Sequence, residues 1–371
     1  MHKLLVINPG STSTKIAVYQ GSQPIFVQVL RHSGEELARY ERIYDQYQFR
    51  KKAVLEALAE AGIQVAELDA VVGRGGLLRP IPGGTYSVNE AMLADLRVGI
   101  SGEHASNLGG LLAHEIAHTH AIPAYIVDPV VVDELEEVAR LSGLPGIQRV
   151  SIFHALNQKA IARRAAADLG QEYEGSNFVV AHLGGGISVG AHAHGRVIDV
   201  NNALNGEGPF SPERTGGLPV LALAELCLSG KYSEPEVRRM LVGNGGLMAY
   251  LGTNDGVEVG RRIAAGEQWA LLVYRAMAYQ IAKEIGSAAT VLRGQVDAIV
   301  LTGGLAYDQE YLVPWIKEKV AYIAPVMVYP GEDELSALAE GALRVLTGQE
   351  EARVYAPAPD FTERLDRVAL P

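Results

Sequence analysis

Apolar residues and short polar turns alternate at the start of the chain, and the same layout returns in its middle. Each time, three strand-like runs are joined by two turns of small or polar residues, a pattern typical of β-hairpins. The runs lie at 3–7, 15–19, 25–30, 177–182, 187–193 and 196–200. A layout that occurs twice predicts an internal duplication, with one domain built on each copy.

Other apolar segments complete the two halves. Runs at 70–72, 124–128 and 298–302 predict parallel strands joined by crossover helices. A helical period follows, in which Trp269, Val273, Met277 and Ile281 recur every four residues and are expected to pack in the core. The chain is therefore predicted to be an α/β protein.

Breaks in the pattern suggest where the domains meet. Residues 142–146 combine serine, glycine and proline, so we place the first domain at 1–145 and the second at 146–334. A last helical pattern covers 337–346. Residues 356–371 carry proline and charge and are expected to form a loose tail.

Composition narrows the possible partners. The formal net charge is −11 and no block of lysine or arginine occurs, which argues against a nucleic acid or an anionic membrane as partner. Cys227, the one cysteine, lies in an apolar run and is expected to be a buried hydrophobe. No apolar run approaches the roughly 20 residues that span a bilayer. Because the first residues also lack a signal-peptide pattern, we expect a cytoplasmic protein.

The first hairpin turn has the composition of a phosphate-binding loop. Small residues let backbone N–H groups approach oxygens, the hydroxyls of Ser11 and Ser13 can donate, and Lys15 adds positive charge. Asn8 could orient a metal ion or its water. A polar turn without a ligand explains this segment on its own, so both interpretations stay open at this point.

Two further glycine-rich turns change that balance. One is the segment with His182, Gly184, Gly185 and Gly186, and the other contains Gly303 and Gly304 directly after the strand at 298–302. Ligands of open α/β sheets bind at such strand ends. The hairpin turns at 8–15 and 182–186, one in each duplicated domain, could hold a nucleotide from both sides.

Together, the hairpin at 8–15, the Phe153–His154 pair, residues 180–186 and residues 302–304 resemble the acetate and butyrate kinases. These belong with the sugar kinases, heat-shock chaperone ATPases and actin. The resemblance extends from residue 3 to about 348. It implies two ribonuclease-H-like domains of the actin-like ATPase fold, an interdomain cleft that holds MgATP, and a helix near 335–350 that completes the first domain. The first motif has proline at position 9, where acetate kinases have alanine, and in this respect it resembles the butyrate kinases.

The resemblance also implies roles for single residues. The catalytic positions are Arg74, Asp128, His154 and Arg214, and the acyl group lies near His104 and Asn107. Nucleotide contacts are implied for Asn8, Ser11, Ser13, Lys15, His182, Gly184, Gly185, Gly186, Gly303 and Gly304. Asn8, Asp333 and Glu334 are the metal-side residues, although the register leaves Glu332, Asp333 and Glu334 as alternatives. The chain departs from acetate kinases at Gln158, where they have a second histidine, and at Gly185, where they have asparagine.

These residue types suit phosphoryl transfer to a carboxylate. A carboxylate is ionised at neutral pH and needs no general base, but an anion must approach a polyanion. Arginines, a histidine and Mg²⁺ can stabilise that charge. We therefore expect ATP or ADP and Mg²⁺ as cofactors and a small carboxylate such as butyrate as substrate. A homo-oligomer is a separate expectation that these residues do not determine.

Two other functions stay open. A kinase that acts on a hydroxyl, such as a sugar kinase, would need a carboxylate base, and Asp128 is the candidate. A non-catalytic ATP-driven clamp would gain nothing from two arginines and a histidine at the phosphate.

Overall fold

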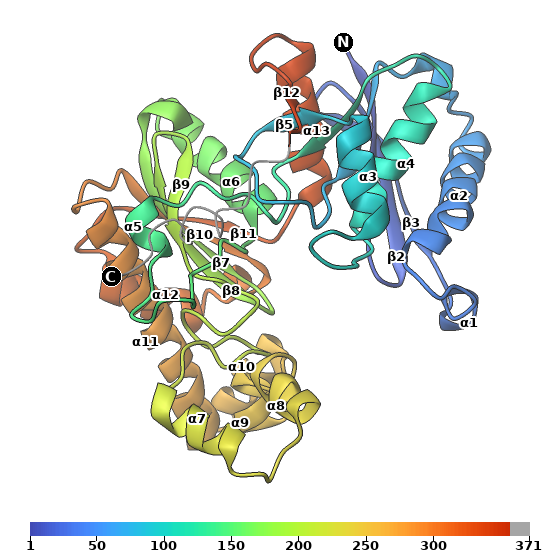
Figure 1. Cartoon of the computed structure of the whole chain (residues 1–371). Helices are drawn as coiled ribbons and strands as arrows, with labels where there is room; N and C mark the ends of the chain where they lie inside the picture. The colour runs from blue at the N-terminus through green and yellow to red at the C-terminus, as the bar shows by residue number, and fades with distance from the viewer. Residues whose placement is uncertain (357–371) are drawn as a thin grey trace, which may run out of the picture. The chain divides into compact units, whose positions relative to one another are not determined.

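The computed structural model describes residues 1–356, so the predicted tail lies outside the described residues except for residue 356. The described chain forms two compact units. Unit 1 combines Met1–Val132 with the residues from Asp333 onward, and unit 2 is Asp133–Glu332 (Figure 1). Each unit contains one sheet with helices packed on it. The predicted α/β class is confirmed, whereas the boundary near 145 stays a prediction.

Unit 1 is built on a seven-stranded sheet in the order β12-β5-β6-β4-β1-β2-β3. Its strands are β1 (Lys3–Pro9), β2 (Ser13–Gln20), β3 (Gln23–Arg31), β4 (Ala70–Arg74), β5 (Thr85–Ser87), β6 (Ala124–Val127) and β12 (Arg353–Val354). The predicted hairpins are present, since β1 to β3 pair antiparallel in sequence order. β4 then joins β1 in parallel, with Ile7 opposite Gly73.

Helices cover both faces of this sheet. They are α1 (Gly34–Leu37), α2 (Tyr47–Glu60), α3 (Glu90–Val98), α4 (Asn107–His118) and α13 (Glu334–Leu346), with 3₁₀ turns at Tyr44–Gln46 and Val65–Glu67. α4 lies against β4 so closely that a Cβ on Gly73 would overlap the backbone of Gly109. On α13, a Cβ on Gly341 would overlap Val127 of β6. In the β4–β6 register, Gly73 lies opposite Ile126, the residue before Val127. Successive residues of a strand point to opposite faces, so Gly73 and Val127 face opposite sides of the sheet, and α4 and α13 pack on different faces.

A buried arginine fixes the turn between β1 and β2. Arg50 on α2 is fully buried. Its guanidinium donates to the carbonyl oxygens of Gly10, Ser11 and Ser13 and to the side-chain oxygens of Thr14 and Gln46, at 2.8–3.1 Å. Burial lowers the pKa of Arg50 to about 10, so it remains charged at neutral pH. The turn conformation therefore depends on one side chain from another element.

Unit 2 contains a five-stranded sheet in the order β11-β10-β7-β8-β9. Its strands are β7 (Asn177–Leu183), β8 (Ile187–Ala193), β9 (Arg196–Val200), β10 (Ala298–Gly303) and β11 (Val326–Pro330). β7 to β9 form the second predicted antiparallel meander. β10 lies parallel to β7, with Thr302 opposite His182. Unit 2 thus repeats the strand arrangement of unit 1 at its centre.

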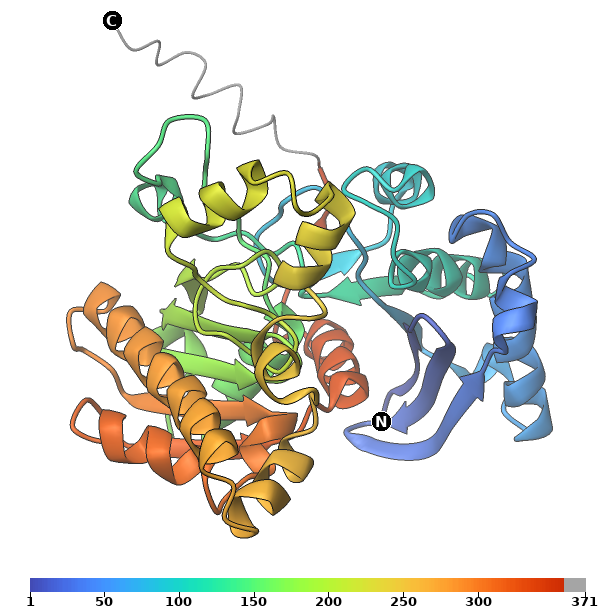
Figure 2. The same ribbon diagram turned by 90° about the horizontal axis from the view of Figure 1, so that it is seen from below.

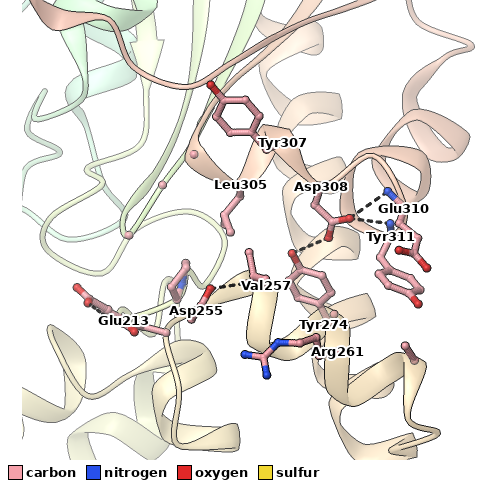
Figure 3. A pocket seen from close by; sticks show the side chains of 18 residues that line it. Glu213, Asp255, Val257, Arg261, Tyr274, Leu305, Tyr307, Asp308, Glu310 and Tyr311 are labelled. Carbon is pink, nitrogen blue, oxygen red and sulfur yellow. Dashed lines mark hydrogen bonds between the residues drawn. The ribbon is translucent and has the colours of Figure 1, made fainter.

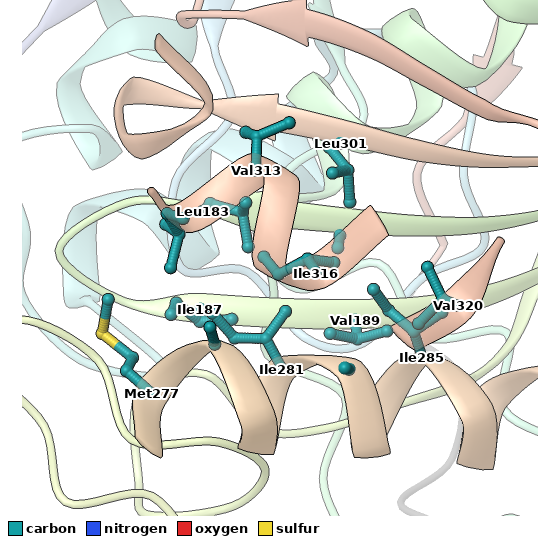
Figure 4. Close-up of a cluster of buried hydrophobic side chains, with 14 of the residues drawn as sticks. Leu183, Ile187, Val189, Met277, Ile281, Ile285, Leu301, Val313, Ile316 and Val320 are labelled. Atoms are coloured by element: carbon teal, nitrogen blue, oxygen red, sulfur yellow. The ribbon is translucent and has the colours of Figure 1, made fainter. Parts of the chain in front are cut away.

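The sheet of unit 2 separates two apolar layers. Its helices are α5 (Glu137–Arg140), α6 (Ala155–Asp168), α7 (Val220–Leu228), α8 (Glu234–Leu241), α9 (Gly246–Leu251), α10 (Gly256–Ala264), α11 (Gln268–Val291) and α12 (Leu312–Val320), with 3₁₀ turns at Tyr173–Gly175 and Gly304–Tyr307. α6 packs on one face through Ala162, Ala165 and Ala166. α11 and α12 pack on the other face (Figures 2 and 4).

The predicted core face of α11 is correct except at its first position. Val273, Met277 and Ile281 are buried, whereas Trp269 is 51% exposed. Trp269 lies in the first turn of the helix, where its indole N–H donates to the carbonyl oxygen of Tyr250 at 3.3 Å. At the end of a helix, the apolar stripe extends beyond the sheet that it covers.

The expectation for Cys227 is wrong, because the cysteine is exposed. It lies on α7, no residue of which is buried, and Val220, Leu221 and Leu228 are 77–86% exposed. α7 belongs to the helical segment between β9 and α11 and reaches the surface rather than the sheet (Figure 1). Across residues 1–356, no helix is both long and apolar enough to cross a membrane.

Replacing Arg50 by methionine tests its role in the first turn. The substitution removes the donor of the part-buried carbonyl oxygens of Gly10 and Ser11 and of the buried Thr14 hydroxyl, so we expect a loss of about 2–4 kcal/mol of stability. The measurement is the urea midpoint of the full chain. Lys52→Met is the matched control, because Lys52 lies on the same helix with its side chain 75% exposed. Equal midpoints for both variants would contradict the role of Arg50.

Candidate active site

The end of β1, the end of β4 and the start of α13 bring three polar side chains of unit 1 together. The parallel register of β1 and β4 places Asn8 and Arg74 at the same sheet edge. Asn8 Nδ2 donates to Glu334 Oε2 at 2.7 Å, and Arg74 Nη1 lies 2.7 Å from Glu334 Oε1. Arg74 also reaches Asn8 Oδ1 at 3.4 Å. Three predicted site residues are therefore in contact.

The acids near residue 333 have different partners. Asp333 is the N-cap of α13 and accepts from the backbone N–H of Ser336 at 3.0 Å. Glu334 contacts Asn8 and Arg74, and within unit 2 Glu332 lies 3.0 Å from His182 Nε2. Magnesium usually takes one or two carboxylates together with waters and phosphates. The oxygens of Asn8 and Glu334 are of the type that magnesium takes, and a bound ion would have to replace their present contacts with Arg74. Residues 1–356 contain no cluster of three or more acids, histidines or cysteines arranged for a metal.

Asp128 follows β6 directly and is held by backbone contacts. It is 3% exposed, and its Oδ1 accepts from the N–H of Gly84 at 2.7 Å. Its φ of +36° is unusual for a residue other than glycine, and such backbone strain is concentrated at functional positions. The β4–β6 register pairs Arg74 with the residue before Asp128, so both lie at one edge of the sheet.

His104 and Asn107 lie near the start of α4. The N–H of Ser106 donates to His104 Nδ1 at 3.2 Å, so this nitrogen is an acceptor and the neutral ring carries its proton on Nε2. Burial and, second, Arg74 lower the pKa of His104. The side-chain amide of Asn107 bonds the N–H of Leu77 and the carbonyl oxygen of Gly102. Asn107 therefore shapes the loop after Arg74.

The remaining candidates of unit 1 lie in its first turn. Lys15 and Ser11 are exposed, and Ser13 is half-buried at the start of β2. Lys15 pairs with Asn8 across the β1–β2 hairpin. Arg50, which no sequence motif indicated, holds the carbonyl oxygens of this turn. A charged residue among the buried positions of α2 was the available signal.

The glycine turn of unit 2 contacts the second predicted arginine. A Cβ on Gly186 would overlap Arg214 Nη1, so the guanidinium lies directly against this glycine. Arg214 Nη1 donates to the carbonyl oxygen of Ala203 at 2.6 Å, and burial lowers its pKa. Ser211 was not predicted, yet its hydroxyl donates to the carbonyl oxygen of Gly185 at 2.6 Å. Gly185 itself has open space where a Cβ would stand, with Glu213 Oε2 nearest at 3.7 Å.

Two candidate histidines of unit 2 stack on each other. The rings of His154 and His182 lie 3.7 Å apart between centroids and 11° from parallel. His154 precedes α6 and lies 2.9 Å from Ser188 Oγ through Nδ1. His182, near the end of β7, lies 2.7 Å from Asn157 Oδ1 through Nδ1. α6 thus supplies Asn157 as the partner of His182. It also supplies Gln158, which bonds Ser188, the partner of His154.

A pocket of about 560 Å³ opens beside the glycine turns of unit 2. Gly184, Gly185 and Gly304 are among its lining residues. Leu305 and Tyr307 add apolar surface (Figure 3). Other lining residues are Pro212, Glu213, Asn254, Asp255, Gly256, Val257, Gly260, Arg261, Ala264, Tyr274, Asp308, Glu310 and Tyr311. Most of these come from α10 and its neighbours, which sequence motifs did not indicate.

Hydrogen bonds hold the pocket wall in place. Tyr274 donates to Asp308 Oδ2 at 2.9 Å, and Asp308 Oδ1 accepts from the N–H groups of Glu310 and Tyr311 (Figure 3). Burial, together with the Asp308 charge, raises the pKa of Tyr274. Gly303 has a φ of +89°, and a Cβ there would overlap the carbonyl of Leu183. Gly303 is therefore needed for the close approach of β10 to β7.

Solved structures share this fold. Acetate kinase from Porphyromonas gingivalis is 20% identical with a TM-score of 0.77, covering 93% of this chain and 100% of its own. A propionate kinase from Francisella tularensis is 21% identical with a TM-score of 0.71, covering 92% and 99%. Acetate kinase from Entamoeba histolytica is 17% identical with a TM-score of 0.72, covering 91% and 98%. The fold is that of the actin-like ATPases, as predicted.

The sequence itself assigns the family. The sequence model of the acetokinase family matches residues 113–322, and the chain belongs to this family. Its members are carboxylate-directed kinases that use ATP or ADP. The expected relationship to acetate and butyrate kinases is confirmed at this level, and the choice of butyrate stays a prediction.

Two neighbouring glycines give a matched pair of variants. Gly186→Ala forces the Arg214 guanidinium to move, so we expect a folded protein whose turnover falls by at least 10-fold. Gly185→Ala meets no protein atom closer than 3.7 Å, so it should keep the same melting temperature but weaken ATP binding. Melting curves, turnover and calorimetric titration with ATP distinguish the two effects. Unchanged ATP affinity in Gly185→Ala would indicate that this turn does not bind the phosphates of ATP.

Proposed function

We propose that this protein transfers the γ-phosphoryl group of ATP to a short-chain carboxylate, butyrate or a branched equivalent, in a reversible reaction. The supporting observation is the contact between the half-buried Arg214 and Gly186 beside a nucleoside-sized pocket. Family membership supports the reaction class. The same turn therefore offers both a place for phosphates and a positive charge.

The pocket of unit 2 is the proposed nucleoside site. Its volume lies within the range of small-ligand pockets, about 300–1,000 Å³. Leu305 and Tyr307 offer apolar surface to a base, and Asp255 offers a carboxylate. Asp255 Oδ1 caps α10 through the N–H of Val257, which leaves Oδ2 for a ribose hydroxyl. The phosphates would then lie along Gly184 and Gly185.

The proposed reaction is one in-line displacement. A carboxylate oxygen attacks the γ-phosphorus, forming an O–P bond while the bond from that phosphorus to the β–γ bridging oxygen breaks. ADP leaves with the electron pair, and no proton moves. The protein therefore has to place two anions and stabilise the charge on the transferring group.

Residues of both units have roles in this proposal. Arg214 and Arg74 donate to phosphoryl oxygens, and a bidentate fork suits that contact. His154 donates a hydrogen bond to the same group. Asn8 and Glu334 would hold Mg²⁺, which neutralises phosphate charge when bound. Asp128 and His104 shape the acyl side, and Asn107 holds the loop that follows Arg74.

The acyl preference is the least constrained part of the proposal. The butyrate-like first motif with Pro9 favours a four-carbon acid, although this turn is proposed to contact phosphate rather than the acyl tail. Acetate or propionate is the alternative within the family. A hydroxyl-directed kinase would use Asp128 as base, but Asp128 Oδ1 already accepts from a backbone N–H.

Removing either arginine should abolish most activity without unfolding the protein. We expect Arg74→Ala and Arg214→Ala each to lower turnover about 10²–10³-fold, the usual cost of losing one charge-stabilising donor. A hydroxamate trap measures acyl phosphate and does not respond to sugar phosphates. Arg238→Ala is the matched control, because that arginine is 76% exposed on α8. Wild-type turnover in both site variants, with native circular dichroism, would refute the assignment.

A series of acids tests the acyl preference. An apolar pocket separates neighbouring chain lengths by only about 1–3 kcal/mol per methylene. We therefore expect kcat/KM to be highest for butyrate or isobutyrate, lower for propionate and valerate, and poor for acetate. A sharp maximum at acetate would contradict the butyrate proposal and leave the carboxylate kinase in place.

A further inference from the structure

A continuous chain of hydrogen bonds runs through the interior of unit 2 behind His154. It links His154 Nδ1 to Ser188 Oγ at 2.9 Å and Ser188 Oγ to Gln158 Nε2 at 2.8 Å. Gln158 Oε1 then lies 3.0 Å from His192 Nε2, and His192 Nδ1 lies 2.8 Å from the Tyr173 hydroxyl. Ser188, Gln158 and His192 are all 0% exposed, so bulk water does not reach these three side chains.

The direction of the chain follows from its glutamine. Gln158 Nε2 lies 3.0 Å from the backbone carbonyl oxygen of Ser188, which can only accept. This contact fixes the orientation of the amide, so Nε2 donates and Oε1 accepts. Gln158 therefore donates to the Ser188 hydroxyl on one side and accepts from His192 on the other.

The far end of the chain agrees with this direction. His192 must carry a proton on Nε2 to donate to Gln158 Oε1. Burial, with a smaller contribution from Lys159, holds the pKa of His192 well below its usual value, so the ring is neutral. Its Nδ1 is then an acceptor, and the Tyr173 hydroxyl donates to it. Each donor in the chain thus meets an acceptor.

The near end of the chain is His154. The Ser188 hydroxyl has one hydrogen, and this hydrogen cannot point at the Gln158 amide, which itself donates to the hydroxyl oxygen. We infer that the Ser188 hydroxyl donates to His154 Nδ1, so that Gln158 and Ser188 are positioning residues that keep His154 neutral with its proton on Nε2. His154 is then fixed as a hydrogen-bond donor through Nε2.

The stacked histidine and one glycine support this arrangement. Two charged imidazoles 3.7 Å apart would repel, so the stacked rings are not expected to carry charge at the same time. On β8, a Cβ at Gly190 would come within 2.6 Å of Gln158 Oε1 and 3.2 Å of His192 Nε2. The missing side chain makes room for the contact between these two groups.

The inference rests on the proposed function only for its catalytic consequence. A neutral histidine with a fixed donor nitrogen can bond a phosphoryl oxygen without giving up a proton. A histidine that exchanges tautomers would present that donor for only part of the time. The tautomer itself is a property of the free protein and can be measured without substrate.

Long-range ¹H–¹⁵N correlation spectra of the full chain identify the protonated nitrogen of each histidine. We expect His154, assigned by comparison with His154→Gln, to carry its proton on Nε2. In Ser188→Ala and in Gln158→Met this preference should weaken, and kcat should fall about 10–100-fold, the usual effect of losing a partner that orients a functional histidine, with little change in KM for ATP. Gln171→Met is the matched control, because Gln171 is exposed beyond the end of α6. Its side chain accepts a hydrogen bond from the Ser176 hydroxyl, which is not part of the chain behind His154.

The outcomes separate the two proposals. A wild-type His154 with its proton on Nδ1 overturns the inference, even if neither variant folds. A variant with lower kcat and an unchanged tautomer also overturns it, because the loss is then structural. Failure to form any acyl phosphate, with the tautomer as expected, removes the proposed function and leaves the positioning role of Ser188 and Gln158.

Discussion

In each unit, the first strand of the antiparallel hairpin also pairs in parallel with a later strand, β1 with β4 and β7 with β10. This parallel pairing determines where polar residues can gather. In unit 1 this pairing sets Ile7 opposite Gly73, so Asn8 and Arg74 follow at one edge. In unit 2 it sets Thr302 opposite His182. A shift by one residue would turn these side chains to the other face of the sheet. The contacts described at the strand ends of each unit therefore depend on strand register.

The sequence predicted the sheets well because their signals are local. Each meander strand is a short apolar run closed by small polar residues, and β8 and β9 match the predicted ranges. Trp269 and Cys227 were misjudged for the opposite reason. An apolar run shows that a helix has an apolar face but not whether another element covers that face. α7 has such a face and leaves it exposed.

The candidate site was predictable where its residues stand in motifs next to strand ends. Arg74, His182 and the glycine turns are of this kind. Arg50 and Ser211 were missed because their contacts join segments far apart in the chain. The pocket was missed for the same reason, since α10 and the turn after β10 meet only in the folded unit. In the sequence, Gln158 was only a difference from acetate kinases. The structure shows that its side chain bonds Ser188 on β8.

The contact between Gly186 and Arg214 links two positions that are remote in sequence. Because the guanidinium fills the space of a side chain at 186, a larger residue there either displaces the guanidinium or needs a smaller residue at 214. A smaller residue at 214 in turn removes the positive charge from the turn. A substitution at 186 therefore also changes where the charge of Arg214 lies. A redesign of this turn has to treat both positions as a single choice.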